Sequence, residues 1–373
     1  MRMNQKSRLA LAAGVVAAMV ALVTIFGYHD QHAPAWQTQE RWLPELATRL
    51  AQVNKVRLRS GASVVTLVRE GEHWGIEERD GFPADFRQLQ TLLDALASAR
   101  LIERKTSQPE YLGRLGLVDI ERPDTDAVQV EVWAGGDEPI VRVLIGNSGG
   151  VRGGRFVRAA NEQQAWLIDT APQPLAEPAD WIERRLLGVA FTRVATVERE
   201  LGGQQEFLAT RNTSGDDASL NAQSLPAGKA PRYISVFDAA ARSILTMEPE
   251  DVRKATEGDY ADAVLTRITC FDGLQIEARA HKAADGNWMT LAVRVDATRV
   301  PPDAPEDSAA KPATEPTQSP LAVREEAARL AQRIDGWAFK VSDYVAGEAT
   351  KPLADYIQDE RPAAKPADGA HNR

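Results

Sequence analysis

The spacing of hydrophobic residues changes period several times along the chain. Val53–Leu58 and Ser63–Arg69 read as two short strands separated by a Ser60-Gly61 turn, and His73–Ile76 reads as a third. The apolar positions then recur every three or four residues, which predicts an amphipathic helix; they are Phe86, Leu89, Leu92, Leu93 and Leu96. The pattern therefore predicts a strand–strand–strand–helix unit.

A similar pattern returns near residue 264. Leu265–Phe271 is followed by an Asp272-Gly273 turn, a second strand from Leu274, and a third strand around Trp288. A later stripe predicts the helix that closes this unit: Val323, Ala327, Leu330 and Ile334. We therefore expect an α+β fold of repeated small antiparallel-sheet-plus-helix modules, in which residues 53–76 match 264–291 and a weaker echo lies at 193–210.

Between these segments, the chain predicts an antiparallel meander and a short helix. Val128–Val132 alternates as a half-buried strand does, and further strand signals lie at 141–145, 156–157 and 166–168. Asp180 has the type of a helix cap, and the apolar residues that follow it predict a helical face; they are Trp181, Ile182, Leu186 and Leu187.

These elements divide the chain into two modules, at residues 53–190 and 191–357. The second module contains two polar insertions, a mobile loop at 213–231 and a solvated linker at 300–320 that is rich in proline and alanine. Residues 358–373 are expected to be disordered.

The segment from Leu9 to Tyr28 contains no charged residue and is long enough, as a helix, to cross a bilayer. We interpret it as an uncleaved transmembrane signal anchor that contacts the lipid bilayer. The alternative is a cleaved signal peptide, whose best cleavage site, Ala33-Pro34-Ala35, lies several residues beyond the apolar run.

The basic residues before this segment set the expected orientation. Arg2, Lys6 and Arg8 precede the apolar run, and no Lys or Arg follows it until Arg41. We therefore expect a cytoplasmic stub at 1–8, a juxtamembrane segment at 29–52, and a periplasmic location for the rest of the chain. This describes a single-pass protein of the inner (cytoplasmic) membrane.

The amino-acid composition and net charge argue against some classes of function. The chain has 373 residues, of which 26% are charged, and its formal net charge is −9. An acidic balance argues against nucleic acid as a partner, because affinity for phosphate comes from concentrated Lys and Arg. The single cysteine, Cys270, excludes an intramolecular disulfide and lies in a strand-like run, where we expect a small buried side chain.

Two groups of residues are candidate contact sites. The glycine-rich run at 146–155 lacks the lysine of a phosphate-binding loop and leads into a strand, so we interpret its glycines as hairpin residues, although Arg152, Arg155 and Arg158 could hold an anion. Trp74 and Trp288 could stack on a carbohydrate, but their strand positions favour a role as core anchors.

Catalytic and metal-binding signatures do not emerge from the sequence. His-Glu-x-x-His, cysteine-based zinc spacings and a Gly-x-Ser-x-Gly elbow are all missing from the chain. We therefore assign no catalytic, metal-binding or cofactor-binding residue, and we expect no cofactor.

Several short segments resemble domain-of-unknown-function family 4340. They are Val53–Leu58, Leu67–Trp74, Phe82–Asp85, Tyr111 with Leu115-Gly116-Leu117 and Pro123, Leu144–Gly146, Phe156–Arg158 and Gly336–Phe339. The resemblance implies a membrane-anchored extracytoplasmic protein, often associated with gliding-motility-type auxiliary components of ABC transporters. It brings no catalytic residues, and the insertions at 213–231 and 300–320 depart from the family pattern.

The sequence thus leads to three functional hypotheses. The first is a non-enzymatic accessory or scaffold component of an ABC-type transport assembly, with a membrane partner of the ABC-2 exporter type. The alternatives are a binding module for an envelope polymer such as a glycan, and an envelope hydrolase. The sequence does not determine the oligomeric state.

Overall fold

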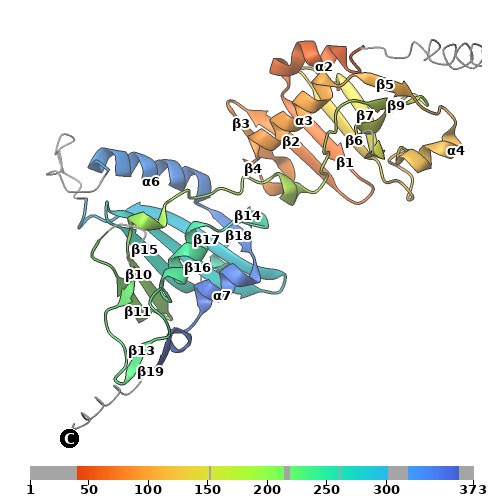
Figure 1. Ribbon diagram of the computed structural model, residues 1–373. Helices are drawn as coiled ribbons and strands as arrows, with labels where there is room; N and C mark the ends of the chain where they lie inside the picture. The colour runs from red at the N-terminus through yellow and green to blue at the C-terminus, as the bar shows by residue number, and fades with distance from the viewer. Residues whose placement is uncertain (1–39, 151–152, 214–218, 260–261, 301–317, 361–373) are drawn as a thin grey trace, which may run out of the picture. The chain divides into compact units, whose positions relative to one another are not determined.

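The computed structural model describes residues 40–150, 153–213, 219–259, 262–300 and 318–360 (Figure 1). These residues form two compact units. Unit 1 comprises Arg87–Ala176 and the described residues up to Thr66, and unit 2 comprises Leu67–Phe86 and the described residues from Glu177 onward. Antiparallel sheets with a few helices dominate the structure, which confirms an α+β fold.

The first sheet has nine strands in the order β4-β3-β2-β1-β6-β7-β8-β9-β5. The helices in the segment of the chain that forms this sheet are α2 (Pro44–Arg49), α3 (Phe86–Ser98) and α4 (Pro109–Leu112). The strands are β1 (Lys55–Arg59), β2 (Val64–Glu70), β3 (His73–Ile76), β4 (Phe82–Pro83), β5 (Leu101–Arg104), β6 (Val128–Trp133), β7 (Val141–Ser148), β8 (Arg155–Ala159) and β9 (Ala165–Ile168).

The second sheet has eight strands in the order β12-β11-β10-β15-β16-β17-β18-β14, and β13 (Lys229–Pro231) pairs separately with β19 (Ile357–Asp359). Its helices are α5 (Asp238–Leu245), α6 (Pro320–Ile334) and α7 (Asp343–Thr350). The strands are β10 (Val194–Leu201), β11 (Gln204–Thr210), β12 (Asn221–Ala222), β14 (Asp251–Lys254), β15 (Val264–Cys270), β16 (Leu274–Ala283), β17 (Gly286–Val295) and β18 (Trp337–Val341).

Seven strands follow the same plan in each sheet. The order β2-β1-β6-β7-β8-β9-β5 corresponds strand by strand to β11-β10-β15-β16-β17-β18-β14. In the first sheet, the hairpin β1–β2 is followed by α3 and the edge strand β5, and the chain then returns as β6 beside β1. In the second sheet, the hairpin β10–β11 is followed by α5 and the edge strand β14, and the chain then returns as β15 beside β10. α6, between β17 and β18, has no counterpart between β8 and β9.

This shared order changes the match that we expected from the sequence. β15, β16 and β17 take the places of β6, β7 and β8, so the segment 264–291 does not correspond to 53–76. The counterpart of β1 and β2 is the hairpin β10–β11, at the position of the weaker echo at 193–210. The expectation was wrong because a three-strand meander with short turns gives the same hydrophobic pattern wherever it lies in a sheet.

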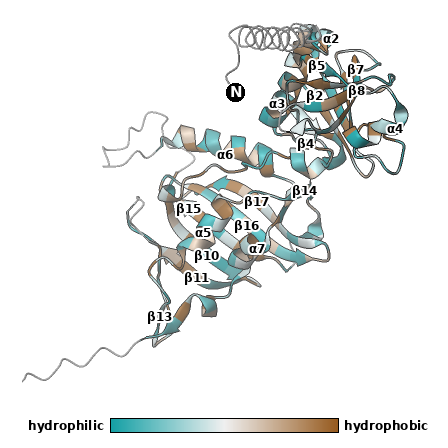
Figure 2. Ribbon diagram, turned by 45° about the vertical axis from the view of Figure 1, so that its right-hand side comes forward, coloured by the Kyte–Doolittle hydropathy of each residue, from teal (hydrophilic) through white to brown (hydrophobic). Residues whose placement is uncertain are grey.

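The alternation along the strands separates an apolar face from a polar face. In unit 1, Val56 and Leu58 are buried, whereas Arg57 between them is partly exposed. In unit 2, α7 packs against β15, β16 and β17, α5 packs against β10 and α7, and α6 packs against β17. Figure 2 shows hydrophobic and hydrophilic residues alternating along α6, whose buried side is formed by Val323, Ala327, Leu330 and Ile334.

A buried guanidinium organises the core of unit 2. Arg199, on β10, is fully buried and donates hydrogen bonds to the carbonyl oxygens of Glu348 and Lys351 at the end of α7 and to the hydroxyl of Tyr356. The last carbonyl groups of a helix lack intrahelical donors, so a cation there satisfies them and also opposes the negative end of the helix dipole. The side chain therefore links the sheet to the C-terminal segment.

Three expectations about local structure need correction. The segment after Asp180 is not an α-helix: a 3-10 turn at Pro178–Trp181 gives way to extended chain, and Ile182 forms a bridge with Ala84. The stretch 213–231 contains β12 and β13, so it is not an unstructured loop throughout. Gln358 and Asp359 belong to β19, where pairing with β13 satisfies their backbone, so the expected disordered tail does not begin at 358.

Other expectations concern residues outside the described part of the chain. These include the stub at 1–8, the anchor at 9–28, residues 29–39 of the juxtamembrane segment and most of the linker at 300–320. Among the residues that the structure describes, no helix is long and apolar enough to cross a membrane.

The Arg199 contacts lead to a local prediction. Substitution of Arg199→Met removes the guanidinium donors to the end of α7, so the part-buried carbonyl oxygen of Lys351 loses its donor and that of Glu348 keeps only the Tyr356 hydroxyl. We expect the opening free energy of α7 amides to fall by about 2 kcal/mol, which corresponds to about 30-fold faster hydrogen exchange. Exchange mass spectrometry of residues 343–356 measures this change.

The matched control is Arg122→Met, because Arg122 pairs with Asp124 on the exposed surface. We expect exchange in the control to match that of the original chain. Unchanged exchange of α7 in the Arg199→Met protein would contradict the proposed link.

Candidate functional site

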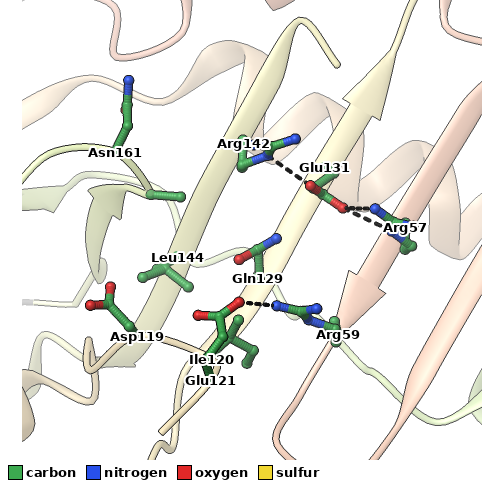
Figure 3. Close-up of a pocket in the computed structure, with 11 residues that line it drawn as sticks. Arg57, Arg59, Asp119, Ile120, Glu121, Gln129, Glu131, Arg142, Leu144 and Asn161 are labelled. Carbon is green, nitrogen blue, oxygen red and sulfur yellow. Dashed lines mark hydrogen bonds and ion pairs between the residues drawn. The ribbon is translucent and has the colours of Figure 1, made fainter. Parts of the chain in front are cut away.

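The polar face of unit 1 contains a hollow of about 360 Å³. Figure 3 shows its residues, which come from β1, β6, β7, the chain segment before β6 and the turn after β8. The lining is mostly charged or amide-bearing and includes Arg57, Arg59, Asp119, Glu121, Gln129, Glu131, Arg142 and Asn161. Such a lining suits a polar or charged ligand surface rather than an apolar small molecule.

A row of three charges crosses this hollow. Arg57 on β1 lies opposite Glu131 on β6, which in turn lies opposite Arg142 on β7. Arg57 donates two hydrogen bonds to one carboxylate oxygen of Glu131, at 2.6 and 2.8 Å, and Arg142 donates to the other at 2.8 Å. Both oxygens of Glu131 are therefore occupied by guanidinium groups (Figure 3).

Burial differs along the row. The side chain of Glu131 is 5% exposed, whereas those of Arg57 and Arg142 are 39% and 51% exposed. A buried carboxylate is tolerated when charged donors satisfy its oxygens. The two arginines therefore hold the carboxylate while part of each guanidinium remains accessible to solvent.

The sequence specifies this row through alternation and register. Alternate positions of β1 carry Lys55, Arg57 and Arg59, and the antiparallel pairing aligns them with Trp133, Glu131 and Gln129. Charges that lie directly opposite on neighbouring strands interact strongly enough to influence pairing. At the rim of the hollow, Arg59 forms an ion pair with Glu121.

Unit 2 has a row at the corresponding strands. Glu198 on β10 lies opposite Arg267 on β15, which lies opposite Glu277 on β16. Arg267 donates to Glu198 at 2.5 Å and to Glu277 at 3.2 Å, and it also reaches Glu200. A second hollow, of about 300 Å³, lies on the same sheet beside β16 and β17 and is lined in part by Arg279 and Arg294.

A second polar cluster in unit 2 surrounds Asp259. This carboxylate accepts from Arg253, from the backbone and hydroxyl of Thr256, and lies 3.1 Å from Nε2 of His281. The hydrogen bonds from Arg253, followed by those from Thr256, lower the pKa of Asp259 far below its usual range. Its occupied oxygens make Asp259 a structural anion rather than a general base.

The two tryptophans predicted as possible sugar platforms are buried. Trp74 is 8% exposed and Trp288 is 4% exposed. Arg253 lies over the Trp288 ring at 4.3 Å, and the indole nitrogen donates to Asp285. Trp74 lies on β3 and Trp288 on β17, strands that do not correspond in the shared order. Their positions are those of core anchors.

The predicted arginine group does not form one surface. Arg158 is buried, donates to the carbonyl oxygens of Leu117 and Glu162, and forms an ion pair with Asp119. Arg155 donates to Pro172 and Gln173, and Arg152 lies outside the described residues. Arg158 therefore fixes the segment that covers the sheet, and we do not include it in the candidate contact surface.

The glycines of this run permit close backbone approach. A side chain at Gly146 would lie 2.2 Å from the carbonyl oxygen of Leu115, and one at Gly154 would lie 2.0 Å from that of Ile168. Gly149 and Gly154 close the turn between β7 and β8 with a backbone hydrogen bond. These contacts support the interpretation of the run as a hairpin.

Neither the single cysteine nor the His, Asp and Glu side chains of the described residues form a reactive or metal-binding centre. Burial raises the pKa of the Cys270 thiol to about 12, so the thiol stays protonated at neutral pH. Within the described residues, no group of three or more His, Cys, Asp or Glu side chains is placed to hold a metal ion.

The sequence pattern missed the residues of the charged rows. Arg57 and Glu131 each occupy an outward position of an alternating strand, a signal that many solvated strands share. Only the cross-strand register shows that they meet, and the register links positions 74 residues apart.

Comparison with known protein families identifies the family of this chain. Residues 74–266, more than half of its length, match the family described as Domain of unknown function (DUF4340). The chain belongs to the DUF4340 family. This confirms the resemblance, and the match runs from β3 to β15, across the hairpin β10–β11. No match was found among curated proteins or among solved structures.

The Glu131 geometry gives a prediction for this DUF4340 protein. Glu131→Gln keeps the shape of the side chain but removes the charge between two guanidinium groups. We expect the unfolding free energy to fall by about 1–2 kcal/mol, because two charge-assisted contacts are weakened. The loss stays modest because the partly exposed arginines can form hydrogen bonds with water instead. Equilibrium urea unfolding measures the loss. The control, Glu121→Gln, alters a 72% exposed partner of Arg59 and should change stability by less than about 0.5 kcal/mol.

The Asp259 cluster predicts a dependence on pH. Because the pKa of this carboxyl is lowered in the folded state, its contribution is present above the unfolded pKa of about 4 and is lost as pH falls below that value. We therefore expect Asp259→Asn to lower the melting temperature at pH 7, with a difference that shrinks steadily below about pH 4.

Thermal melts followed by circular dichroism between pH 7 and pH 2 test this expectation. Asp126→Asn, which changes an exposed carboxyl, is the control and should leave the melting temperature unchanged. A difference between Asp259→Asn and the original protein that stayed constant over this range would contradict the assignment.

Proposed function

We propose that this DUF4340 protein is a non-enzymatic, membrane-anchored periplasmic protein that acts as an accessory or scaffold component of an ABC-type transport assembly. The observation that carries the proposal is the charged row at the hollow of unit 1. There, accessible guanidinium groups of Arg57 and Arg142 are held in place by a buried carboxylate. Preorganised charges of this kind give specificity to protein contacts.

The same geometry supports binding rather than acid–base chemistry. A general acid or base must exchange a proton with a substrate, which requires an accessible oxygen or nitrogen. Both oxygens of Glu131 accept hydrogen bonds from arginines, and the oxygens of Asp259 are similarly occupied. We therefore favour a partner protein over a substrate for this surface, and we rank an envelope hydrolase last.

We infer that the common strand order reflects an internal repeat of one α+β module, joined to a transmembrane helix at residues 9–28. Each module presents a charged sheet face, so one chain offers two contact surfaces of the same architecture. A tether near the membrane would raise the effective concentration of these surfaces toward a membrane partner.

The proposed partner is a membrane protein of the ABC-2 exporter type. This assignment rests on the association described for proteins that resemble this family, and on the expected periplasmic location of both modules. A glycan-binding module remains the alternative, but the burial of Trp74 and Trp288 leaves it with less support.

Affinity purification of the tagged full chain from mild detergent tests the proposal. We expect a membrane subunit of an ABC-2-type exporter to be recovered with it, identified by mass spectrometry. The variant Arg57→Ala/Arg142→Ala should recover at least about tenfold less of that subunit, because it removes both accessible cations of the row.

Two controls sharpen this experiment. Lys229→Ala/Asp359→Ala removes an exposed ion pair elsewhere in the chain and should leave recovery unchanged. A version lacking residues 1–28 should fold but lose the partner if the tether contributes. Recovery of the intact protein with no exporter subunit would count against the proposed function.

A further inference from the structure

The hollow of unit 2 lies beside the charged row of that sheet and has a lining of its own. Its volume is about 300 Å³. Its lining includes Arg279 from β16, Thr290 and Arg294 from β17, and Asp335 with Gly336 from the junction between α6 and β18. None of these residues belongs to the row that crosses β10, β15 and β16, so the hollow is a separate feature of the surface.

The strand register explains why the hollow forms. Thr290, Ala292 and Arg294 occupy alternate positions of β17, so their side chains project from the same face of the sheet. On β16, Arg279 lies opposite Thr290, and Glu277 lies opposite Ala292. Because the side chain of Ala292 is only a methyl group, the space between the two long arginine side chains is left open.

The two arginines retain donors that a ligand can use. Arg279 donates to Oε2 of Glu277 at 3.3 Å, and Nη2 of Arg294 lies 4.0 Å from the same oxygen. Among the residues that the structure describes, this is the only hydrogen bond of Arg279, and Arg294 forms none. Their side chains are 31% and 65% exposed. Each guanidinium has five N–H donors, so the pair suits an oxyanion that both groups contact.

The opposite border of the hollow is negative. β18 lies on the side of β17 away from β16, and Asp335 and Gly336 directly precede β18. Asp335 is exposed, and within the described part of the chain its carboxylate forms no ion pair. It also follows the last residue of α6, where the helix dipole is negative. This border therefore suits an ammonium group.

The two borders together select for a ligand that carries both charges. A simple anion is attracted by the arginines but repelled by Asp335, and a simple cation meets the reverse. The strands on either side of β17 are about 10 Å apart, which leaves room for a molecule with a few bonds between its charged groups. The volume also lies at the small end of the range for ligand pockets.

We propose that this hollow binds a small soluble zwitterion, with its oxyanion on Arg279 and Arg294 and its ammonium group on Asp335. The oxyanion is a carboxylate or a phosphate, because guanidinium groups bind both. The site does not use Arg57 or Arg142, so it can be confirmed or rejected whatever the outcome for the proposed transport assembly.

Isothermal titration calorimetry of the full chain in non-ionic detergent, at low ionic strength, tests the proposal. The probes are phosphoethanolamine and 4-aminobutyrate, which separate an ammonium group from a phosphate or a carboxylate by the same number of chain atoms. Ethyl phosphate is the matched probe without the ammonium group. We expect a Kd of about 1 mM or tighter for at least one zwitterion, and the tighter of the two identifies the preferred oxyanion. Ethyl phosphate should bind at least about fivefold more weakly than phosphoethanolamine.

Two variants separate the two borders of the site. Arg279→Gln/Arg294→Gln should weaken the binding of the preferred zwitterion at least about tenfold, because it removes both guanidinium groups. Asp335→Asn should weaken the same binding about fivefold, because the ammonium group loses its counterion. The same variant should strengthen the binding of ethyl phosphate, because it removes a negative charge near the anion. A purely structural role of Asp335 would not give these opposite responses.

Two substitutions of matched exposure are the controls. Arg122→Gln changes a side chain that is 64% exposed, and Asp126→Asn changes another exposed carboxyl; both should leave the Kd unchanged. Circular dichroism melts show whether the double variant folds, and Arg294→Gln alone replaces it if it does not. The proposal would be overturned if neither zwitterion bound, if ethyl phosphate bound as tightly as phosphoethanolamine, or if the arginine and Asp335 variants bound as the original does.

Discussion

The register of the antiparallel strands is the constraint on which the rest of this structure depends. It places Arg57, Glu131 and Arg142 side by side on three strands, although they are far apart in the chain. Because side chains alternate between faces, a shift by one residue would move all three into the apolar layer. Burial of Val56 and Leu58 on the opposite face therefore fixes the charged row as firmly as the ion pairs do.

Buried arginines hold the less regular segments against these sheets. Arg199 binds the end of α7, Arg158 binds the segment around Leu117, and Arg211 donates to the carbonyl oxygens of Phe191 and Val194. In each case at least two partners are backbone carbonyl groups, which a planar guanidinium can reach in several directions at once. An arginine in a strand pattern can thus be a buried residue, as Arg158 is, although the sequence pattern alone left it as a residue that could hold an anion.

The sequence predicted local elements better than their arrangement. The stripe at Phe86–Leu96 became α3, the run at Val128–Val132 became β6, and the interruption by Ser60-Gly61 separated β1 from β2. The repeat was placed wrongly because β15–β17 and β1–β3 have similar patterns but different neighbours. The charged rows were missed because the partner of an outward-facing arginine cannot be identified until the strand register is known. Asp180 does not cap an α-helix, because the chain after it continues as extended backbone.

The two rows show how an open sheet face can hold a carboxylate that is almost fully buried. In unit 1 the 5% exposed Glu131 lies between Arg57 and Arg142, and in unit 2 the 7% exposed Glu277 lies within ion-pair distance of three arginines. Such a carboxylate is tolerated because guanidinium groups on neighbouring positions satisfy its oxygens. The arginines remain partly exposed, so each carboxylate serves to hold cations at the surface. The register therefore determines both the stability of these rows and the charge that each face presents.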